Sequence, residues 1–125
     1  MSENTTTFTV LHLRFKLLVH PDLLLAKSLE AARVIASLEG LIWKIWLSKE
    51  KEFEMGGMYL FANRQAAEAY LNHPIVLAVR SNPAVASSES QLWDVENSLS
   101  AVTRGPLQNF GAQASERELV FAGGQ

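Results

Sequence analysis

The sequence predicts an α+β domain in which helices cover one face of a four-stranded antiparallel sheet. Three observations lead to this class. Four segments are rich in β-branched and aromatic residues, and two helical patterns lie between them. A short charged reversal joins the second and third β-rich segments, as in a hairpin. The resulting order, strand, helix, strand, strand, helix, strand, is the split βαβ arrangement of ferredoxin-like folds.

The first strand is expected over residues 8–18, where Leu11, Leu13 and Phe15 belong to one nearly apolar face. His12 belongs to the opposite face, which is apolar at its start and basic at its end. His20-Pro21-Asp22 ends the strand and begins a helix, because proline suits the first helical turn. That helix is expected to continue to Gly40, with this apolar stripe: Leu25, Leu29, Ala32 and Ala36.

The hairpin is expected within residues 40–61, GLIWKIWLSKEKEFEMGGMYLF. Its two strands, 41–47 and 55–61, flank the charged reversal. Regular alternation divides the first of these strands into two sets of side chains, Leu41, Trp43, Ile45 and Leu47 on one face and Ile42, Lys44 and Trp46 on the other. Both faces therefore carry apolar bulk, whereas a sheet with one solvated face alternates apolar and polar residues.

The last elements follow from capping residues and breakers. Asn63 is a good N-cap for a second helix from Arg64 to about Leu71. Residues 75–79 are suited to a further helical turn or two after the His73-Pro74 break. The last strand is expected over residues 89–95.

The length of 125 residues corresponds to one domain, which we assign to residues 7–96. Residues 1–6 are expected to be disordered, and residues 97–125 are expected to form an arm or tail. A net charge of −2 with interspersed signs argues against a nucleic-acid partner, and no apolar run is long enough to cross a membrane. The absence of cysteine and of a signal-peptide pattern favours the cytoplasm.

Two helices can cover only one face of a four-stranded sheet. The other face, with Val10, Ile42 and Trp46 on it if alternation is regular, would leave a larger apolar patch than monomers usually expose. A second copy offers the same surface, because a two-fold interface is self-complementary. We therefore expect a homodimer that packs sheet against sheet.

Four segments together resemble the YdhR-type monooxygenases of the dimeric α/β-barrel superfamily: Leu11–Phe15, Gly40–Trp46, Gly56–Phe61 and Ala67–Leu71. The W-K-(I/V)-W and G-G-(I/M)-Y-L-F elements carry most of the likeness, which covers residues 8–96. The resemblance implies two ferredoxin-like subunits whose sheets face each other as a barrel. It also implies kinship with small cofactor-independent oxygenases that act on polycyclic aromatic or quinol-like molecules.

An oxygenase without a cofactor needs a dry pocket, a base that ionises the substrate, and groups that stabilise the anion. His12 is the candidate base, because it lies among apolar residues and histidine is the usual general base near neutral pH; an ordinary interior or interface histidine is the alternative. Tyr59 and Arg80 are candidates for binding oxygen substituents. The alternatives are a tyrosine that satisfies a backbone group and a solvated arginine.

The candidate substrate-binding residues are Trp43, Trp46, Phe61, Gly57 and His73. Regular alternation puts Trp43 on the helix side of the sheet, where it would stack on a substrate ring, and Trp46 on the barrel side. Core packing is the alternative for both tryptophans. Gly57, with Gly56, suits a bulge that makes room for a ligand, and His73 suits either a pocket contact or a cap on the last carbonyls of the second helix.

The leading hypothesis is a homodimeric, cofactor-independent monooxygenase that acts on an aromatic or quinol-like small molecule. A non-catalytic dimer that binds or senses a small apolar molecule is the competing hypothesis. A haem-handling relative with His12 or His73 as axial ligand is a third. No metal or other cofactor is expected, because the three histidines show no metal-ligand spacing and there is no phosphate loop.

Overall fold

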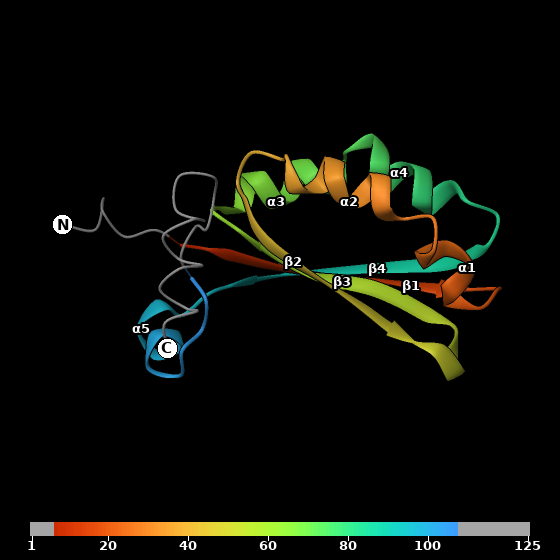
Figure 1. The fold of residues 1–125 in the computed structure, drawn as a ribbon. Helices are drawn as coiled ribbons and strands as arrows, with labels where there is room; N and C mark the ends of the chain where they lie inside the picture. Colours follow the sequence, from red (N-terminus) through yellow and green to blue (C-terminus); the bar gives the residue numbers. More distant parts are fainter. Residues whose placement is uncertain (1–6, 108–125) are drawn as a thin grey trace, which may run out of the picture.

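The computed structural model describes residues 7–107, in which a layer of helices lies on a four-stranded sheet (Figure 1). The strands are β1 (Thr9–Leu17), β2 (Leu41–Lys49), β3 (Glu54–Phe61) and β4 (Val85–Asp94). Their order in the sheet is β2-β3-β1-β4, and every neighbouring pair is antiparallel. The predicted ferredoxin-like class is confirmed, with β4 starting earlier than expected.

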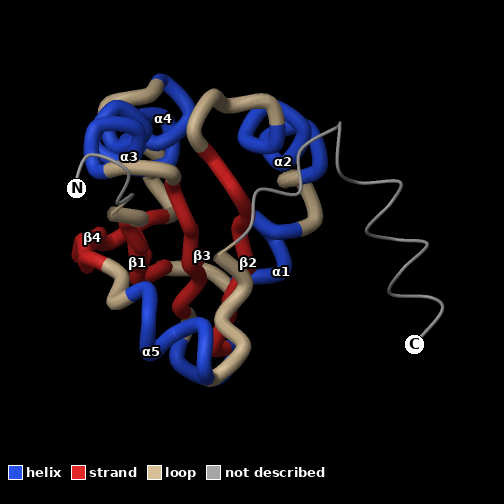
Figure 2. Tube along the Cα trace, turned by 90° about the vertical axis from the view of Figure 1, so that its left-hand side faces the viewer, coloured by secondary structure: helices blue, strands red, loops and turns tan. Residues whose placement is uncertain are grey.

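The layer on one face consists of α2 (Leu29–Ala36), α3 (Arg64–Leu71) and α4 (Pro74–Ser81), and α1 (Pro21–Leu25) lies at the end of the sheet where β1 finishes. Figure 2 shows α2 beside the paired α3 and α4, with the strands beneath them. The short helix α5 (Asn97–Val102) lies on the other side of the sheet. A 3-10 turn, η2 (Glu50–Glu52), closes the hairpin between β2 and β3. No helix within residues 7–107 is long and apolar enough to cross a membrane.

The helix after β1 is not continuous, which corrects one expectation. The Ser28 hydroxyl donates a hydrogen bond to the Leu24 carbonyl oxygen at 2.9 Å, and Ser28 then precedes α2 as its N-cap residue. A serine side chain that bonds to nearby backbone competes with the helical pattern. The break changes which side of the helix is buried: Ile35 is 3% exposed, whereas Leu29 is 63% exposed.

A β-bulge near the start of β2 overturns the predicted faces of that strand. Leu41 pairs with Phe61, but Trp43 pairs with Leu60, so that two steps along β2 match one step along β3. From this point the alternation is shifted by one residue. Lys44 and Trp46 therefore face the helices, and Trp43 faces the opposite side. The prediction that Trp43 lies on the helix side and Trp46 on the barrel side is wrong.

The core fills the space between the sheet and the helix layer. It consists of buried side chains from both strands and helices: Leu11, Leu13, Phe15, Leu17, Ile35, Tyr59, Phe61, Ala67, Tyr70 and Val76. The Asn63 side chain accepts a hydrogen bond from the Ala66 amide at 2.8 Å, which confirms the predicted N-cap of α3. This core packs the helices against the sheet, and the candidate site lies in the same layer, between the helices and strands β2 and β3.

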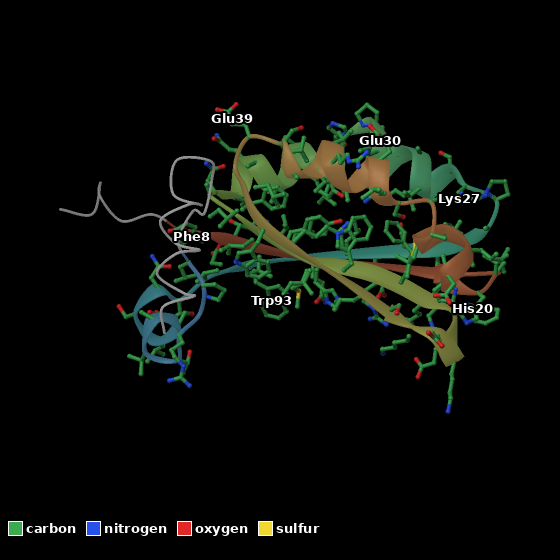
Figure 3. All side chains as sticks on the ribbon, in the orientation of Figure 1. Phe8, His20, Lys27, Glu30, Glu39 and Trp93 are labelled. Atoms are coloured by element: carbon green, nitrogen blue, oxygen red, sulfur yellow. The ribbon has the colours of Figure 1, made fainter. Side chains whose placement is uncertain are left out.

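The face of the sheet opposite the helix layer, which we call the open face, exposes large apolar side chains. Ile45 is 53% exposed and Trp93 is 58% exposed. Figure 3 shows Trp93 on the side of the sheet away from α2, α3 and α4. The segment after α5 reaches this face, where the Trp43 indole donates a hydrogen bond to the Pro106 carbonyl oxygen at 2.9 Å. Residues 1–6 and 108–125, which include most of the predicted arm, lie outside the described residues.

Candidate functional site

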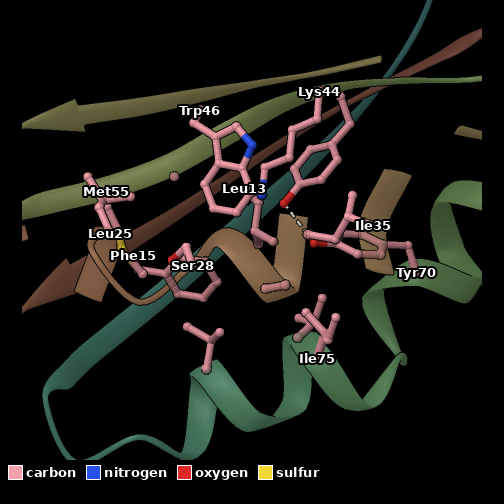
Figure 4. Close-up of a pocket in the computed structure, with 15 residues that line it drawn as sticks. Leu13, Phe15, Leu25, Ser28, Ile35, Lys44, Trp46, Met55, Tyr70 and Ile75 are labelled. Atoms are coloured by element: carbon pink, nitrogen blue, oxygen red, sulfur yellow. Dashed lines mark hydrogen bonds between the residues drawn. The ribbon is translucent and has the colours of Figure 1, made fainter. Parts of the chain in front are cut away.

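A cavity of about 60 Å³ lies between the sheet and the helix layer (Figure 4). Its walls come from β1, β2 and β3 below and from α2, α3 and α4 above, and most of them are apolar. The apolar part of the lining includes Leu13, Phe15, Ile35, Ile75 and Val79. The volume is several times what one buried water needs. A small molecule that enters is therefore largely desolvated.

Lys44 is the one charged residue among the described residues that line this cavity. Its ammonium nitrogen lies 3.3 Å from the centroid of the Trp46 ring and 4.6 Å from that of Tyr59. None of the ion pairs found within residues 7–107 includes Lys44. Burial without a carboxylate partner disfavours the charged form and lowers the pKa of Lys44 to about 7. At neutral pH a large share of this amine is therefore uncharged.

Gly57 provides the space in which the Lys44 side chain lies. A Cβ atom at Gly57 would come within 2.6 Å of the Lys44 Cε atom and 3.1 Å of the Tyr59 ring. Trp46 pairs with Gly57 across the strands, so the aromatic ring and the lysine stem share this site. The glycine thus gives room to a side chain of the protein, and its predicted contact with a ligand stays a prediction.

Two tyrosine hydroxyls meet at the cavity wall. The hydroxyl oxygens of Tyr59 and Tyr70 are 2.8 Å apart and form a hydrogen bond in which either can be the donor. Burial raises the pKa of both phenols, most strongly that of Tyr59, so both stay protonated at neutral pH. Two hydroxyls carry two protons and their mutual bond uses one. Within residues 7–107 no acceptor is found for the other proton, so the pair can donate a hydrogen bond to a bound oxygen.

The structure brings only some of the predicted site residues to this cavity. Tyr59 and Trp46 line it, and Phe61 lies behind them, its ring centroid 5.9 Å from that of Tyr59. His73 lies at the start of α4, where its Nδ1 atom accepts a hydrogen bond from the Ile75 amide at 3.0 Å. It therefore caps the N-terminus of α4 and not the last carbonyls of α3.

The other predicted site residues lie elsewhere. Arg80 is exposed, and its guanidinium is 3.5 Å from the Leu71 carbonyl oxygen. Trp43 lies on the open face, bonded to Pro106. His12 also lies on the open face, opposite Met58 on one side and Gln91 on the other. The roles predicted for these residues stay predictions, and their positions separate them from the helix-side cavity.

His12 borders a groove of about 350 Å³ on the open face, whose end is charged. The Glu54 carboxylate lies 3.1 Å from the Arg14 guanidinium and 3.2 Å from the Lys16 amine. The hydrogen bond from Arg14, followed by that from Lys16, lowers the pKa of Glu54. Because the carboxylate is already paired with two cations, this end of the groove is a structural ion-pair network.

One group of side chains within residues 7–107 has the composition of a metal site. The ligand atoms of His20, Asp22 and Glu50 lie within 4.8 Å of one another near the hairpin end. Asp22 and Glu50 are exposed, and the His20 Nδ1 atom already accepts a hydrogen bond from the Asp22 amide at 3.1 Å. Exposed acidic groups of this kind are common without a metal, and this group lies outside the cavity lining.

Sequence reasoning missed Lys44 and Tyr70 as site residues. The available signal for Lys44 was a lysine between two tryptophans in an otherwise apolar strand. Such a strand is expected to be buried, and lysine is almost never fully buried unless it is paired. Tyr70 lies within the predicted second helix, but nothing in the sequence marked it as a site residue. Its hydroxyl contact with Tyr59 depends on how α3 lies on the sheet, which no local pattern encodes.

Comparisons with known proteins agree on family and fold. The family model "Putative mono-oxygenase ydhR" matches residues 10–106. No curated protein matches. Among solved structures, SnoaB, a cofactor-independent oxygenase from Streptomyces nogalater, is similar with a TM-score of 0.59 and 18% identity, over 74% of this chain and 97% of SnoaB.

Two structures without a stated activity are similar to the same extent. NE2512 from Nitrosomonas europaea, a protein of unknown function, has a TM-score of 0.58 and 23% identity, over 73% of this chain and 91% of its own. SO0527 from Shewanella oneidensis has a TM-score of 0.60 and 11% identity, over 73% of this chain and 93% of its own. At these identities the likeness establishes the fold.

Proposed function

Because the chain belongs to the ydhR mono-oxygenase family, we propose that it is a cofactor-independent monooxygenase of an aromatic, quinol-like small molecule, with Lys44 as the base. The observation that carries this proposal is the amine of Lys44 in an apolar cavity with no carboxylate partner within residues 7–107, where burial lowers its pKa to about 7. Such an amine can remove a proton from a phenol or an activated C–H group at neutral pH. The similarity to SnoaB, named as a cofactor-independent oxygenase, supports the same class of reaction.

The reaction needs only the substrate and dioxygen. Lys44 takes a proton, and the substrate anion passes an electron to dioxygen. Recombination then forms a C–O bond, and the resulting peroxide takes the proton back from Lys44. Loss of water, with the second hydrogen of the same carbon, leaves a carbonyl, so one oxygen atom enters the substrate, the other becomes water, and the substrate supplies all the electrons. The protonated amine of Lys44 stabilises the anionic species, and the Tyr59–Tyr70 pair donates a hydrogen bond to the substrate oxygen.

An aromatic substrate requires the cavity to open. The present 60 Å³ is less than the roughly 150 Å³ of an engineered cavity that holds benzene. Trp46 is 38% exposed, so it can turn outward more easily than the buried core rings. We propose that the substrate ring takes the place of the Trp46 indole beside Lys44, in a position that the ammonium–ring contact already favours.

The proposal includes a homodimer formed through the open face. Exposed apolar side chains lie on both edge strands of that face, Ile45 on β2 and Trp93 on β4. Burying them against a second copy would stabilise the dimer by several kcal/mol at about 25 cal/mol per Å² of apolar area. A dimer would also enclose the groove that borders His12.

Oxygen uptake by the purified protein, with chelator present and a panel of hydroquinones and anthrones, tests the proposal. We expect turnover by the wild type and a loss of at least about a hundredfold in kcat for Lys44→Met, the usual contribution of a general base. Lys51→Met, at the exposed hairpin tip, is the matched control and should keep full activity.

His12→Ala separates the two candidate bases. Because His12 faces away from the cavity, we expect this variant to keep its turnover. Loss of activity in His12→Ala but not in Lys44→Met would reject Lys44 as the base. Tight binding of panel members without oxygen uptake would reject the oxygenase in favour of a binding or sensing protein.

A further inference from the structure

We propose that the helix-side cavity is also a carbonyl-binding site, in which the amine of Lys44 forms a reversible imine with small aldehydes or ketones. This inference stands apart from the oxygenase reaction, because it needs neither dioxygen nor an aromatic ring. It rests on three features of the cavity: the position of the amine, the hydroxyl pair, and the size of the space.

The amine is placed and unpaired as a nucleophile requires. It lines the cavity from β2, with its stem fixed across Gly57 between the Trp46 and Tyr59 rings. No carboxylate within residues 7–107 forms an ion pair with it. Desolvated lysines in apolar pockets are the ones that attack carbonyl groups, because the nitrogen lone pair is free. The lowered pKa of Lys44 has the same cause.

The hydroxyl pair supplies the acid. One proton of the Tyr59–Tyr70 pair has no acceptor within residues 7–107, and both hydroxyls belong to residues that line the same cavity as Lys44. A hydrogen bond from this pair to the carbonyl oxygen polarises the C=O bond and favours addition. Because burial raises the pKa of both phenols, the pair remains a donor across the neutral range.

The reaction is balanced without any oxidant or reductant. The Lys44 nitrogen attacks the carbonyl carbon and forms the C–N bond as the C=O π bond breaks, and one proton of the amine passes to the oxygen to give a carbinolamine. The hydroxyl then takes a proton and leaves as water while the nitrogen lone pair forms the C=N bond, and the nitrogen gives up its remaining proton in return. Water is the only product besides the imine, and hydrolysis reverses the reaction.

The size of the cavity selects the ligand. A space of about 60 Å³ accepts a carbonyl compound of a few heavy atoms without movement of Trp46, in contrast to an aromatic ring. The apolar lining favours short alkyl groups on the carbonyl carbon. Short aliphatic aldehydes and ketones are therefore the ligand class that fits the structure as it stands.

Reductive trapping tests the proposal directly. The full-length protein is incubated with propanal and cyanoborohydride at pH 7, and the propylated sites are mapped by peptide mass spectrometry. A pKa near 7 gives Lys44 a neutral fraction roughly a thousandfold above that of a solvated lysine. We therefore expect Lys44 to be labelled at least about tenfold faster than any other lysine, even allowing for slower access.

The α-amino group is an internal control, since its ordinary pKa is also near neutrality, about 8. Labelling at the N-terminus without labelling at Lys44 would overturn the proposal, because it would show that the reagents work and the cavity amine does not react. Labelling at Lys44 should reach half its maximal rate near pH 7, and at pH 7 it should exceed labelling of the exposed Lys51. Equal rates at both lysines would also overturn it.

A competition arm separates a cavity site from a merely accessible amine. Acetone, which is small enough for the cavity, should slow propanal labelling at Lys44 more strongly than it slows labelling at the N-terminus. Tyr70→Phe removes one hydroxyl of the pair and should slow labelling at Lys44 several-fold while leaving the N-terminal rate unchanged. These comparisons use the rate at one site relative to another in the same folded sample, which circular dichroism verifies.

Discussion

Lys44→Met is expected to make the folded protein more stable at pH 7, by about 3 kcal/mol, although it removes the proposed base. Burial lowers the pKa of Lys44 from about 10.5 to about 7, so at neutral pH the unfolded chain binds a proton that the folded chain only partly retains. At about 1.4 kcal/mol per pKa unit the upper limit is about 5 kcal/mol. The contacts of the Lys44 amine with the Trp46 and Tyr59 rings favour the ammonium ion and offset part of this burial penalty.

The sign of the pH dependence follows from the same shift. Between pH 7 and 10.5 the unfolded state binds more protons at Lys44 than the folded state, so wild-type stability rises with pH across this window. Below pH 7 both states are protonated and the penalty is constant. The difference between Lys44→Met and wild type should therefore be largest at pH 6–7 and should shrink by pH 10.

Urea unfolding at several pH values between 6 and 10 measures this difference. Lys51→Met is again the control, because Lys51 is exposed and its replacement should leave the wild-type curve unchanged within about 0.5 kcal/mol. A Lys44→Met variant less stable than wild type at pH 7 would mean that the ammonium ion is well solvated or paired in the folded state.

Ile45→Glu on the open face is expected to convert the proposed homodimer into a monomer. Ile45 projects from β2 on the side opposite Lys44 and is 53% exposed in the single chain. In a dimer formed through this face, a glutamate here would be buried without a partner, which costs several kcal/mol. The dimer dissociation constant should therefore rise by at least about a thousandfold.

Leu23→Glu is the matched control for this substitution. Leu23 is about as exposed as Ile45, at 58%, but it belongs to α1 at the end of the sheet and not to the open face. Sedimentation velocity over a range of concentrations should show a dimer for wild type and Leu23→Glu and a monomer for Ile45→Glu. A wild-type monomer at high concentration, or dissociation caused by both variants, would reject the proposed interface.

The fold class was predictable because several local signals agree. Pro21 and Asn63 mark the starts of two helices, and Gly40 provides the positive φ of 89° before β2. Alternation in β1 correctly predicts that His12 and Leu13 lie on opposite faces of the sheet. Each of these signals depends on a residue and its near neighbours. The break at Ser28 was missed because the apolar pattern itself runs on through it.

The site was harder to predict because it depends on which face of β2 meets the helices. A single bulge near Ile42 reverses that face for Trp43, Lys44 and Trp46, and nothing in the apolar pattern marks it, since both faces are apolar. Alternation in β1 placed His12 correctly relative to its neighbours, but it could not indicate that the cavity lies on the other side. The Tyr59–Tyr70 contact depends on how α3 docks onto the sheet, which no local pattern specifies.

The ionisation of Lys44 can be measured directly by following the ¹³Cε and ¹⁵Nζ chemical shifts of the lysines with pH in the folded protein. Comparison with Lys44→Met assigns the resonance. A titration midpoint near 7 is expected for Lys44, well below the ordinary lysine value of about 10.5. A midpoint near 10.5 for Lys44 would show a solvated ammonium ion, and it would remove both the base and the carbonyl nucleophile from this cavity.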